Sequence, residues 1–301
     1  MSAAGPLPGA GMPARHAVAR SMLFVPSTSD RKIDKACASP ADAVILDLED
    51  AVAIAEKPAA RRLLRDIVGV PRRLPAWVRI NAMSTPFCLQ DVIATTIPGM
   101  AGIILPKAES AEEIRRIDWL MSQVEIETGL AVGSVGLMAI VETSRGLVNV
   151  DAIAAASPRL VRLLYGAVDL AADMTIDIDD ASGASGHARF AIARASAAAG
   201  LQAPLDTAFA DFANLTELRA TSQRAKGLGF GGKSCIHPTQ VPVVNEVFAP
   251  SAREIAWAER VVAAFAEAEA RGQGAVQIDG EMIDYPVVYR AQRILGARAG
   301  A

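Results

Sequence analysis

The stretch AVILDLEDAV, residues 43–52, starts as an unbroken apolar run and ends in the acids Asp47, Glu49 and Asp50. A short apolar run of this kind is typical of a buried strand. Seven further short runs resemble it, and amphipathic segments rich in Ala, Arg and Glu separate them. The expected strands are residues 21–26, 43–49, 76–81, 101–107, 136–142, 160–167, 202–206 (the weakest) and 232–238. Eight strands alternating with helices predict parallel βαβ units, and eight is the number that closes a barrel.

A doubly wound open sheet is the structural alternative. Such a sheet normally has a glycine-rich phosphate loop after its first strand. Here that place reads Val25-Pro26-Ser27-Thr28, without the GxGxxG pattern. Among the intervening segments, residues 110–128 predict a helix, with Ser110 as N-cap and Glu113 completing a capping box. The sequence therefore favours an α/β fold of the (β/α)8 TIM barrel type.

Polar residues are found where the predicted strands end. The set comprises Asp47, Glu49, Asp50, Arg79, Asn81, Lys107, Glu142, Asp169 and His237. Barrel active sites are built at the carboxyl ends of the strands. Six strands that end in this way predict one site.

The composition changes after the barrel. The pattern predicts a helix at residues 251–271, a break at Gly272 and Gly274, a hairpin at Asp279-Gly280 and a last helix at 286–295. An appendage of this size is too small to fold alone, so we expect it to pack on its own barrel or on a neighbour's. The expected divisions are residues 1–20, a disordered tail, 21–250, the catalytic barrel, and 251–301, a C-terminal helix and lid. A transit peptide is the alternative for the first twenty residues.

Composition excludes several classes. The chain has 301 residues, 51% of them hydrophobic, and a formal net charge of −3. No block of Lys and Arg suggests a nucleic-acid partner, and no apolar run approaches the roughly 18–20 residues that span a membrane. Cys37, Cys88 and Cys235 form no CxxC pair, so neither a zinc site nor a disulfide framework is indicated. A reducing cytoplasm is the expected location.

Short motifs spread from residue 21 to residue 286 resemble the citrate lyase β-subunit-like family within the HpcH/HpaI aldolase/citrate lyase superfamily, which includes malyl-CoA and citramalyl-CoA lyases. They are SMLFVP (21–26), AVILDLEDAV (43–52), VRIN (78–81), ILPK (104–107), AIVET (139–143), GAVDL (166–170), GKSCIHP (232–238) and EMIDYP (281–286). The resemblance implies a Mg²⁺-dependent lyase. Its substrate is a 3-hydroxy-3-carboxyacyl thioester, of the malyl-CoA, citramalyl-CoA or citryl type, which a retro-Claisen reaction cleaves to an acetyl thioester and a 2-keto acid.

The resemblance also implies roles for single residues. Glu142 and Asp169 bind Mg²⁺, with Glu142 also contacting substrate, Arg79 holds the developing enolate oxygen, and Asp284 is the acid/base. The implied CoA and thioester contacts are Phe24, Arg31, Lys35, Lys57, Ile236 and His237. The expected assembly is a homo-oligomer, a trimer or dimer of trimers, with Asp284 reaching the site of an adjacent subunit.

The residues themselves leave other interpretations open. Glu142 and Asp169 could be a solvated acid and a helix cap, and Arg79 could simply pair with Glu49 or Asp50. Asp284 precedes Pro286 and could be an N-cap alone. Asp47, Glu49 and Asp50 are expected to orient Arg79 or metal-bound waters, and strand alternation sends Asp50 to the side opposite the other two. Competing residues are Lys32 and Arg61 for CoA and Asp173 for the metal; His237 is an alternative general base.

Two positions depart from the family pattern. Ser27 stands where Gly is usual, and Val168 stands where an acid usually precedes the metal-binding Asp. A branch of pyruvate aldolases carries His where this chain has Asp50, which argues against that branch. A malyl-CoA thioesterase and a non-catalytic CoA-binding subunit are the alternative functions.

Overall fold

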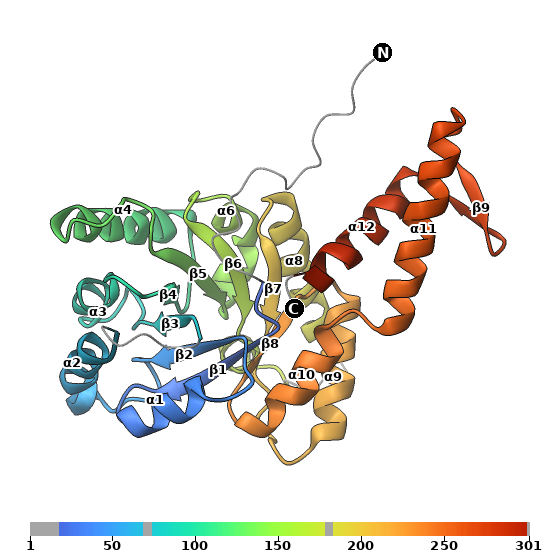
Figure 1. The fold of residues 1–301 in the computed structure, drawn as a ribbon. Coiled ribbons are helices and arrows are strands. Elements are labelled where there is room, and N and C mark those ends of the chain that lie inside the picture. Colours follow the sequence, from blue (N-terminus) through green and yellow to red (C-terminus); the bar gives the residue numbers. More distant parts are fainter. Residues whose placement is uncertain (1–17, 69–73, 178–182, 300–301) are drawn as a thin grey trace. The chain divides into compact units, whose positions relative to one another are not determined.

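The computed structural model describes residues 18–68, 74–177 and 183–299. The chain divides into two compact units, residues 1–245 and 246–301. In the first unit, eight parallel strands follow one another around a closed barrel, which confirms the predicted fold class (Figure 1). The strands are β1 (Ser21–Pro26), β2 (Ala43–Asp47), β3 (Ala76–Arg79), β4 (Gly102–Leu105), β5 (Gly136–Val141), β6 (Leu160–Tyr165), β7 (Gln202–Asp206) and β8 (Gly232–Cys235).

Helices follow the strands of the barrel. They are α1 (Asp30–Cys37), α2 (Lys57–Val68), α3 (Cys88–Thr95), α4 (Ala111–Glu127), α5 (Ser144–Val148), α6 (Val150–Ala154), α7 (Ala167–Met174), α8 (Ala184–Ala198), α9 (Leu215–Gly227) and α10 (Val241–Phe248), with 3-10 helices η1 (Ile54–Glu56) and η3 (Pro238–Gln240). The helices η3 and α10 come after the last strand, β8. The predicted capping box of α4 is confirmed. The Ser110 hydroxyl accepts a hydrogen bond from Glu113 N, and the Glu113 carboxylate accepts one from Ser110 N.

Most of the strands stop one to three residues before their predicted carboxyl ends. The parallel ladder continues for one further bond, for example from Leu48 N to Arg79 O at 2.9 Å. Beyond it the Asp47 carboxylate accepts hydrogen bonds from the backbone amides of Glu49 and Ala51, which turns the chain out of the sheet. The polar residues that mark the strand ends in the sequence therefore belong mostly to the loops.

The barrel interior is filled by alternate residues of seven strands. A cluster of buried side chains comprises Met22, Ala43, Ile45, Trp77, Ile104, Met138, Ile140, Leu164 and Leu205. Trp77 is paired in register with Gly102, which pairs with Gly136. A Cβ atom at Gly102 would overlap the Trp77 ring, so the small residue makes room for the largest interior side chain. This cluster of buried side chains fills the barrel below its carboxyl end.

The N-terminal boundary of the barrel lies earlier than expected. Residues 1–17 of the predicted tail lie outside the described residues. Ala19 packs against the interior cluster, and Arg20 binds Asp42 through its backbone amide at 2.8 Å and through two guanidinium nitrogens at 2.9 Å. A paired guanidinium and an apolar contact therefore join residues 19 and 20 to the barrel.

The second unit is a helical hairpin with a small sheet. It contains α11 (Ala252–Ala270), β9 (Val276–Ile278), β10 (Glu281–Ile283) and α12 (Tyr285–Ala299). The predicted hairpin is confirmed, since Ile278 pairs with Glu281 and the turn residues Asp279 and Gly280 have φ angles of 51° and 87°. Its own core comprises Ala258, Val261, Phe265, Ile283, Val288 and Ala291.

Two findings concern the whole described chain. No described helix has the length and apolar character needed to cross a membrane. Cys37, Cys88 and Cys235 are all buried free thiols.

Candidate active site

The charged side chains form a layer directly above the interior cluster. Asp47, Arg79 and Glu142 each lie two positions beyond a residue of that cluster. Because side chains alternate across a strand, a residue two positions further on points to the same interior face. Parallel strands present all their carboxyl ends at one end of the barrel, so these groups converge there.

Arg79 is held from several directions. Its Nε and Nη2 donate to the two oxygens of Asp47 at 2.7 and 2.6 Å, and its Nη1 lies 2.8 Å from Glu49 Oε2. The Phe24 ring lies 5.0 Å from the guanidinium carbon. Burial opposes the charge, but the bonds to Asp47 and the charge of Glu49 outweigh it and raise the pKa of Arg79. These contacts fix both the position and the orientation of the guanidinium plane, so the cation is already oriented before a ligand binds.

The acidic turn after β2 departs from one prediction. Asp50 was expected on the side opposite Asp47 and Glu49, yet Asp50 Oδ2 lies 3.5 Å from Arg79 Nη1. That prediction was wrong because strand alternation ends at Asp47, where the chain turns. Asp50 is exposed at the rim, so its pairing with Arg79 is weaker than that of the buried Asp47.

Lys107 connects the acids of this layer. Its backbone amide donates to Glu142 Oε1 at 2.8 Å. Its ammonium group lies 3.0 Å from Glu49 Oε1 and 3.3 Å from Asp169 Oδ1. Three carboxylates from different strand ends therefore meet at one lysine. The strand-end pattern included Lys107 but assigned it no role, since only the fold shows that it contacts all three.

Glu142 lies deepest of these acids. Burial, together with the negative charges of Asp169 and Glu49, raises its pKa to about 7. Gly166 makes this position possible, because a Cβ atom there would overlap the Glu142 side chain. Asp169, in the first turn of α7, is partly exposed, so this side of the acidic cluster is accessible to solvent. The described residues include no group of three or more His, Cys, Asp or Glu side chains arranged to hold a metal ion, so any ion would rely on these two carboxylates and non-protein oxygens.

The residues predicted to contact CoA are placed differently from one another. Arg31 and Lys35 are exposed on α1. Phe24 packs on Arg79, and Lys57 is buried, with its ammonium donating to the carbonyls of Leu48 and Glu49 at 2.7 and 2.8 Å. Lys57 therefore fixes the acidic turn itself; its predicted contact with CoA stays a prediction.

Two of the competing residues are engaged elsewhere. Arg61 binds Asp91 at 2.5 Å. Asp173 accepts a hydrogen bond from Ser144 N at 2.7 Å, which lowers its pKa and holds it at the start of α5. Lys32 is exposed on α1 beside the predicted CoA contacts.

Gln240 shapes the rim after β7 and β8. It is buried; its carbonyl oxygen accepts from the amides of Ile236 and His237, and its amide donates to Phe209 O at 2.8 Å. The His237 ring stacks on Phe212 at 4.9 Å and contacts Thr239. Neither Gln240 nor Phe212 was identified from the sequence, where no spacing links the two loops. Ile236 is 44% exposed, so its side chain faces outward from this rim.

Asp284 lies in the second unit at the start of α12. Its carbonyl accepts the helical bond from Val288 N at 3.0 Å, so its backbone is in the N-cap position. Within the described part of the chain, no hydrogen bond or ion pair involves its carboxylate. The capping interpretation therefore accounts for the backbone of Asp284 and leaves its carboxylate unexplained.

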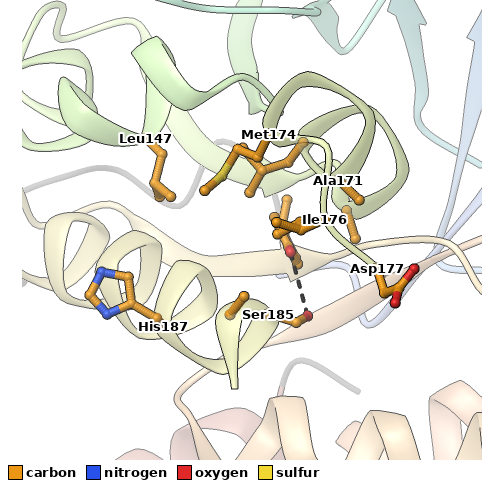
Figure 2. A pocket seen from close by; sticks show the side chains of 11 residues that line it. Leu147, Ala171, Met174, Ile176, Asp177, Ser185 and His187 are labelled. Carbon is orange, nitrogen blue, oxygen red and sulfur yellow. Dashed lines mark hydrogen bonds between the residues drawn. The ribbon is translucent and has the colours of Figure 1, made fainter. Parts of the chain in front are cut away.

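A cavity of about 160 Å³ lies on the other face of α7 from Asp169. Figure 2 shows Met174 and Ala171 of α7 on one side of it, and Ser185 and His187 of α8 on the other. Its walls are mostly apolar, and none of the residues predicted for the site lines it. The charged layer, where the chemically reactive groups converge, is therefore the better candidate for catalysis.

A closed α/β barrel with a preset arginine and clustered carboxylates at its carboxyl end defines a barrel enzyme. The model of the HpcH/HpaI aldolase/citrate lyase family matches residues 20–238. The chain belongs to this family, and it is a lyase.

Relatives extend the match to nearly the whole chain. Citrate lyase subunit beta of Leuconostoc mesenteroides subsp. cremoris is 37% identical over 92% of this chain and 92% of the relative. The (3S)-malyl-CoA thioesterase of Cereibacter sphaeroides is 36% identical over 92% and 93%. The L-malyl-CoA/beta-methylmalyl-CoA lyase of Rhodobacter capsulatus is 33% identical over 94% and 95%. The relatives are thus enzymes that act on citrate or on CoA thioesters.

A solved structure shares the fold. Protein CitE from Mycobacterium tuberculosis, in complex with magnesium, acetoacetate and coenzyme A, superposes with a TM-score of 0.76. It is 35% identical and covers 94% of this chain and 99% of that one.

Proposed function

We propose that this lyase cleaves a 3-hydroxy-3-carboxyacyl thioester of the malyl-CoA or citramalyl-CoA type, with Mg²⁺ as cofactor. The products are a 2-keto acid and acetyl-CoA. The observation that carries the proposal is the meeting of a preset Arg79 with the Glu49–Lys107–Glu142–Asp169 cluster at one barrel end. The malyl-CoA enzymes among the relatives and the magnesium and coenzyme A in the CitE structure support the substrate class and the cofactor.

The acidic layer fits a magnesium ion. Carboxylates are ligands that Mg²⁺ prefers, and the ion commonly takes one or two of them and completes its shell with water and substrate oxygens. Glu142 and Asp169 are the two that would hold it. Glu49 Oε2 is buried without a hydrogen bond of good geometry, although Arg79 Nη1 lies 2.8 Å away, so the layer has unused acceptor capacity. Bound there, Mg²⁺ supplies a Lewis acid for the hydroxyl and carboxylate of the substrate.

Arg79 is the group we assign to the enolate oxygen. A guanidinium has five N–H donors, and the contacts with Asp47 and Glu49 occupy three of them. One remaining donor is on Nη2, and the other is on Nη1, where the exposed Asp50 lies 3.5 Å away. A thioester oxygen that gains negative charge as the carbon–carbon bond breaks can accept from the Nη2 donor, and from the Nη1 donor in place of Asp50. Because Asp47 and Glu49 hold the fork in place, the donors need no reorganisation at that moment.

Asp284 is the group we assign to proton transfer. Asp284 takes the proton from the C3 hydroxyl as the C2–C3 bond breaks, and the electron pair of that bond passes to the enolate of the acetyl thioester. Asp284 then gives this proton to the enolate carbon; in the reverse direction it removes a methyl proton and returns it to the oxygen that becomes the hydroxyl. Its carboxylate has no partner among the described residues, which suits this role better than a cap alone, and the acid also argues against a purely binding subunit. Methyl protons beside a thioester are weakly acidic, so stabilising the enolate matters more than the strength of this base.

A homo-oligomer, a trimer or a dimer of trimers, completes the proposal. Arg31, Lys35, Ile236 and His237 are the residues proposed to meet the CoA portion and the thioester arm. The acid/base reaches the barrel of a neighbouring subunit when the C-terminal unit acts as a lid.

The test is incubation of the purified chain with malyl-CoA and with citramalyl-CoA, each with Mg²⁺ and with EDTA, followed by mass analysis. Glyoxylate or pyruvate together with acetyl-CoA is the expected result. No keto acid from either substrate would contradict the proposed reaction.

Hydrolysis is the second candidate, because a (3S)-malyl-CoA thioesterase is among the relatives at 36% identity. The same binding site with a positioned water would yield malate and free CoA. The assay separates the two outcomes directly, since only hydrolysis leaves the four-carbon acid intact and releases a free thiol.

A further inference from the structure

Lys107 occupies an unusual position in the acidic layer. Its ammonium group lies between Glu49 and Asp169, at 3.0 and 3.3 Å, while its backbone amide binds Glu142. The side chain is about a third exposed, so it reaches the cluster from a position open to solvent. Of the described cations, Lys107 is the one that contacts both a carboxylate of the acidic turn and Asp169.

The backbone at Lys107 is strained. Its φ angle is +49°, a left-handed conformation that residues with a side chain rarely adopt. Glycine would satisfy this turn without the steric cost. A lysine in such a conformation suggests a functional role for its side chain, because strain of this kind concentrates at functional sites.

The charges around Lys107 are not balanced. Five carboxyl groups, those of Asp47, Glu49, Asp50, Glu142 and Asp169, outnumber the three cations of the layer, Arg79, Lys107 and the buried Lys57 on the acidic turn. Arg79 is fixed by its bidentate hydrogen bonds to Asp47 and by the Phe24 ring, whereas Lys107 carries its ammonium group on a flexible four-carbon side chain. A divalent cation that binds Asp169 therefore meets Lys107 as its direct competitor.

We propose that Lys107 is a resident counter-cation that magnesium displaces from Asp169, and that it thereby sets the affinity of the free enzyme for Mg²⁺. The inference rests on the magnesium role proposed above. While no metal is bound, the ammonium keeps the crowded carboxylates from repelling one another. When Mg²⁺ arrives, the same charge opposes it until the side chain swings away. Lys107 is thus a positioning residue whose charge acts through the metal ligands.

The test measures Mg²⁺ binding by calorimetry on the substrate-free full chain at pH 8. Lys107→Met removes the charge, and Lys107→Arg keeps it. Lys107→Gly removes it while suiting the backbone, so it provides a folded charge-free variant if the Met variant is unstable. Lys32→Met removes one exposed cation from α1 and is the matched control.

Charge-free variants should bind Mg²⁺ about tenfold more tightly or better, because even water-like screening leaves a sizeable repulsion between a monovalent and a divalent ion a few ångströms apart. Lys107→Arg and Lys32→Met should stay within about twofold of the unsubstituted chain. Saturating Mg²⁺ should also raise the melting temperature of Lys107→Met by more than that of the unsubstituted chain.

Unchanged or weaker Mg²⁺ affinity in both Lys107→Met and Lys107→Gly would overturn the inference. The result is separable from failure of the proposed function. If the unsubstituted chain binds no Mg²⁺ at all, the magnesium role itself is wrong. If the unsubstituted chain binds Mg²⁺ and the variants bind it with the same affinity, only the proposed role of Lys107 is wrong.

Discussion

Two clusters of buried charge in the barrel unit differ in balance. In the cluster that joins α8 to β7 and β8, here the α8 cluster, Asp206 lies between Arg189 at 2.8 Å and Lys233 at 2.5 Å. These three side chains are at most 8% exposed. In the layer above the barrel core, five acids share three cations, the outer groups reach solvent, and one residue has a positive φ angle.

The difference separates structural charge from functional charge. Each oxygen of Asp206 accepts a hydrogen bond from a cation, so the α8 cluster has no carboxylate oxygen without a cation partner. The acidic layer has an excess of acids, a buried oxygen on Glu49 whose ion pair with Arg79 lacks good hydrogen-bond geometry, and a raised pKa at Glu142. Protein structures tolerate such imbalance where a ligand completes the site, as perturbed groups cluster at functional sites. The variants below should lose stability in one cluster and activity in the other.

Removing a proposed metal ligand should have the largest effect on activity. Glu142→Gln and Asp169→Asn keep the shape of the side chains but weaken the hold on Mg²⁺, so we expect Mg²⁺-dependent cleavage to be abolished while circular dichroism stays unchanged. Chelation with EDTA should do the same to the unsubstituted chain. Full activity in EDTA would refute the metal hypothesis.

The Glu142→Gln chain should also differ in stability. Because the folded-state pKa of Glu142 is raised to about 7, the folded state binds more protons than the unfolded state between its ordinary value and about 7. Metal-free protein therefore loses stability as pH rises through that window. Glu142→Gln should flatten this part of the curve in thermal unfolding with EDTA; an unchanged slope would show that Glu142 is not the source.

Breaking the α8 cluster should give the opposite result. Asp206→Asn leaves Lys233 buried without a counter-charge, which we expect to cost about 3–5 kcal/mol of unfolding free energy. Urea unfolding measures the loss. Asp151→Asn breaks the exposed pair with Arg194 and is the control, with an expected cost below about 1 kcal/mol. Under conditions where it is folded, Asp206→Asn should bind Mg²⁺ as the unsubstituted chain does; weakened metal binding would mean that the two clusters are coupled.

Arg79→Lys should reduce kcat about 10²-fold, the size seen when one donor to a developing oxyanion is lost. The lysine keeps the positive charge but cannot keep both bonds to Asp47 and still offer donors to substrate. Steady-state kinetics with the better of the two malyl-type substrates measures the change. A kcat near that of the unsubstituted chain would leave Arg79 as a structural partner of Asp47 alone.

Much of the barrel could be predicted from the sequence because the same pattern, an apolar run that ends in a polar residue, recurs along the chain. Eight apolar runs and the polar residues at their ends were sufficient for the fold class and for the convergence of Asp47, Arg79 and Glu142. The position of Asp50 could not be predicted, since the turn depends on the Asp47 carboxylate accepting two backbone amides.

Contacts between distant loops also could not be predicted from the sequence. The role of Lys107 depends on a positive φ angle and on carboxylates 58 and 35 positions away along the chain, at Glu49 and Glu142. Gln240 connects two loops through backbone groups that any sequence would supply. Such contacts follow from tertiary packing, and no local pattern encodes them.

The last prediction concerns Asp284. This proposed acid/base belongs to the C-terminal unit and not to the barrel that holds the acidic layer. If it acts on the barrel of a neighbouring subunit, inactive Arg79→Lys and inactive Asp284→Asn chains should regain activity when they are co-assembled. A mixed trimer contains two chains of one kind and one of the other, so about one site in three has neither defect, which sets the expected recovery for oligomers that contain both chains.

The mixture is made by co-expressing the two chains with different affinity tags and purifying on both tags in turn. Each variant co-assembled with a copy of itself is the control, and neither should recover. An acid that acts within its own chain cannot give rescue, because every site then carries one of the two defects. Doubly purified oligomers without activity would therefore exclude the trans arrangement. The role of Asp284 would still stand if its own single variant is inactive.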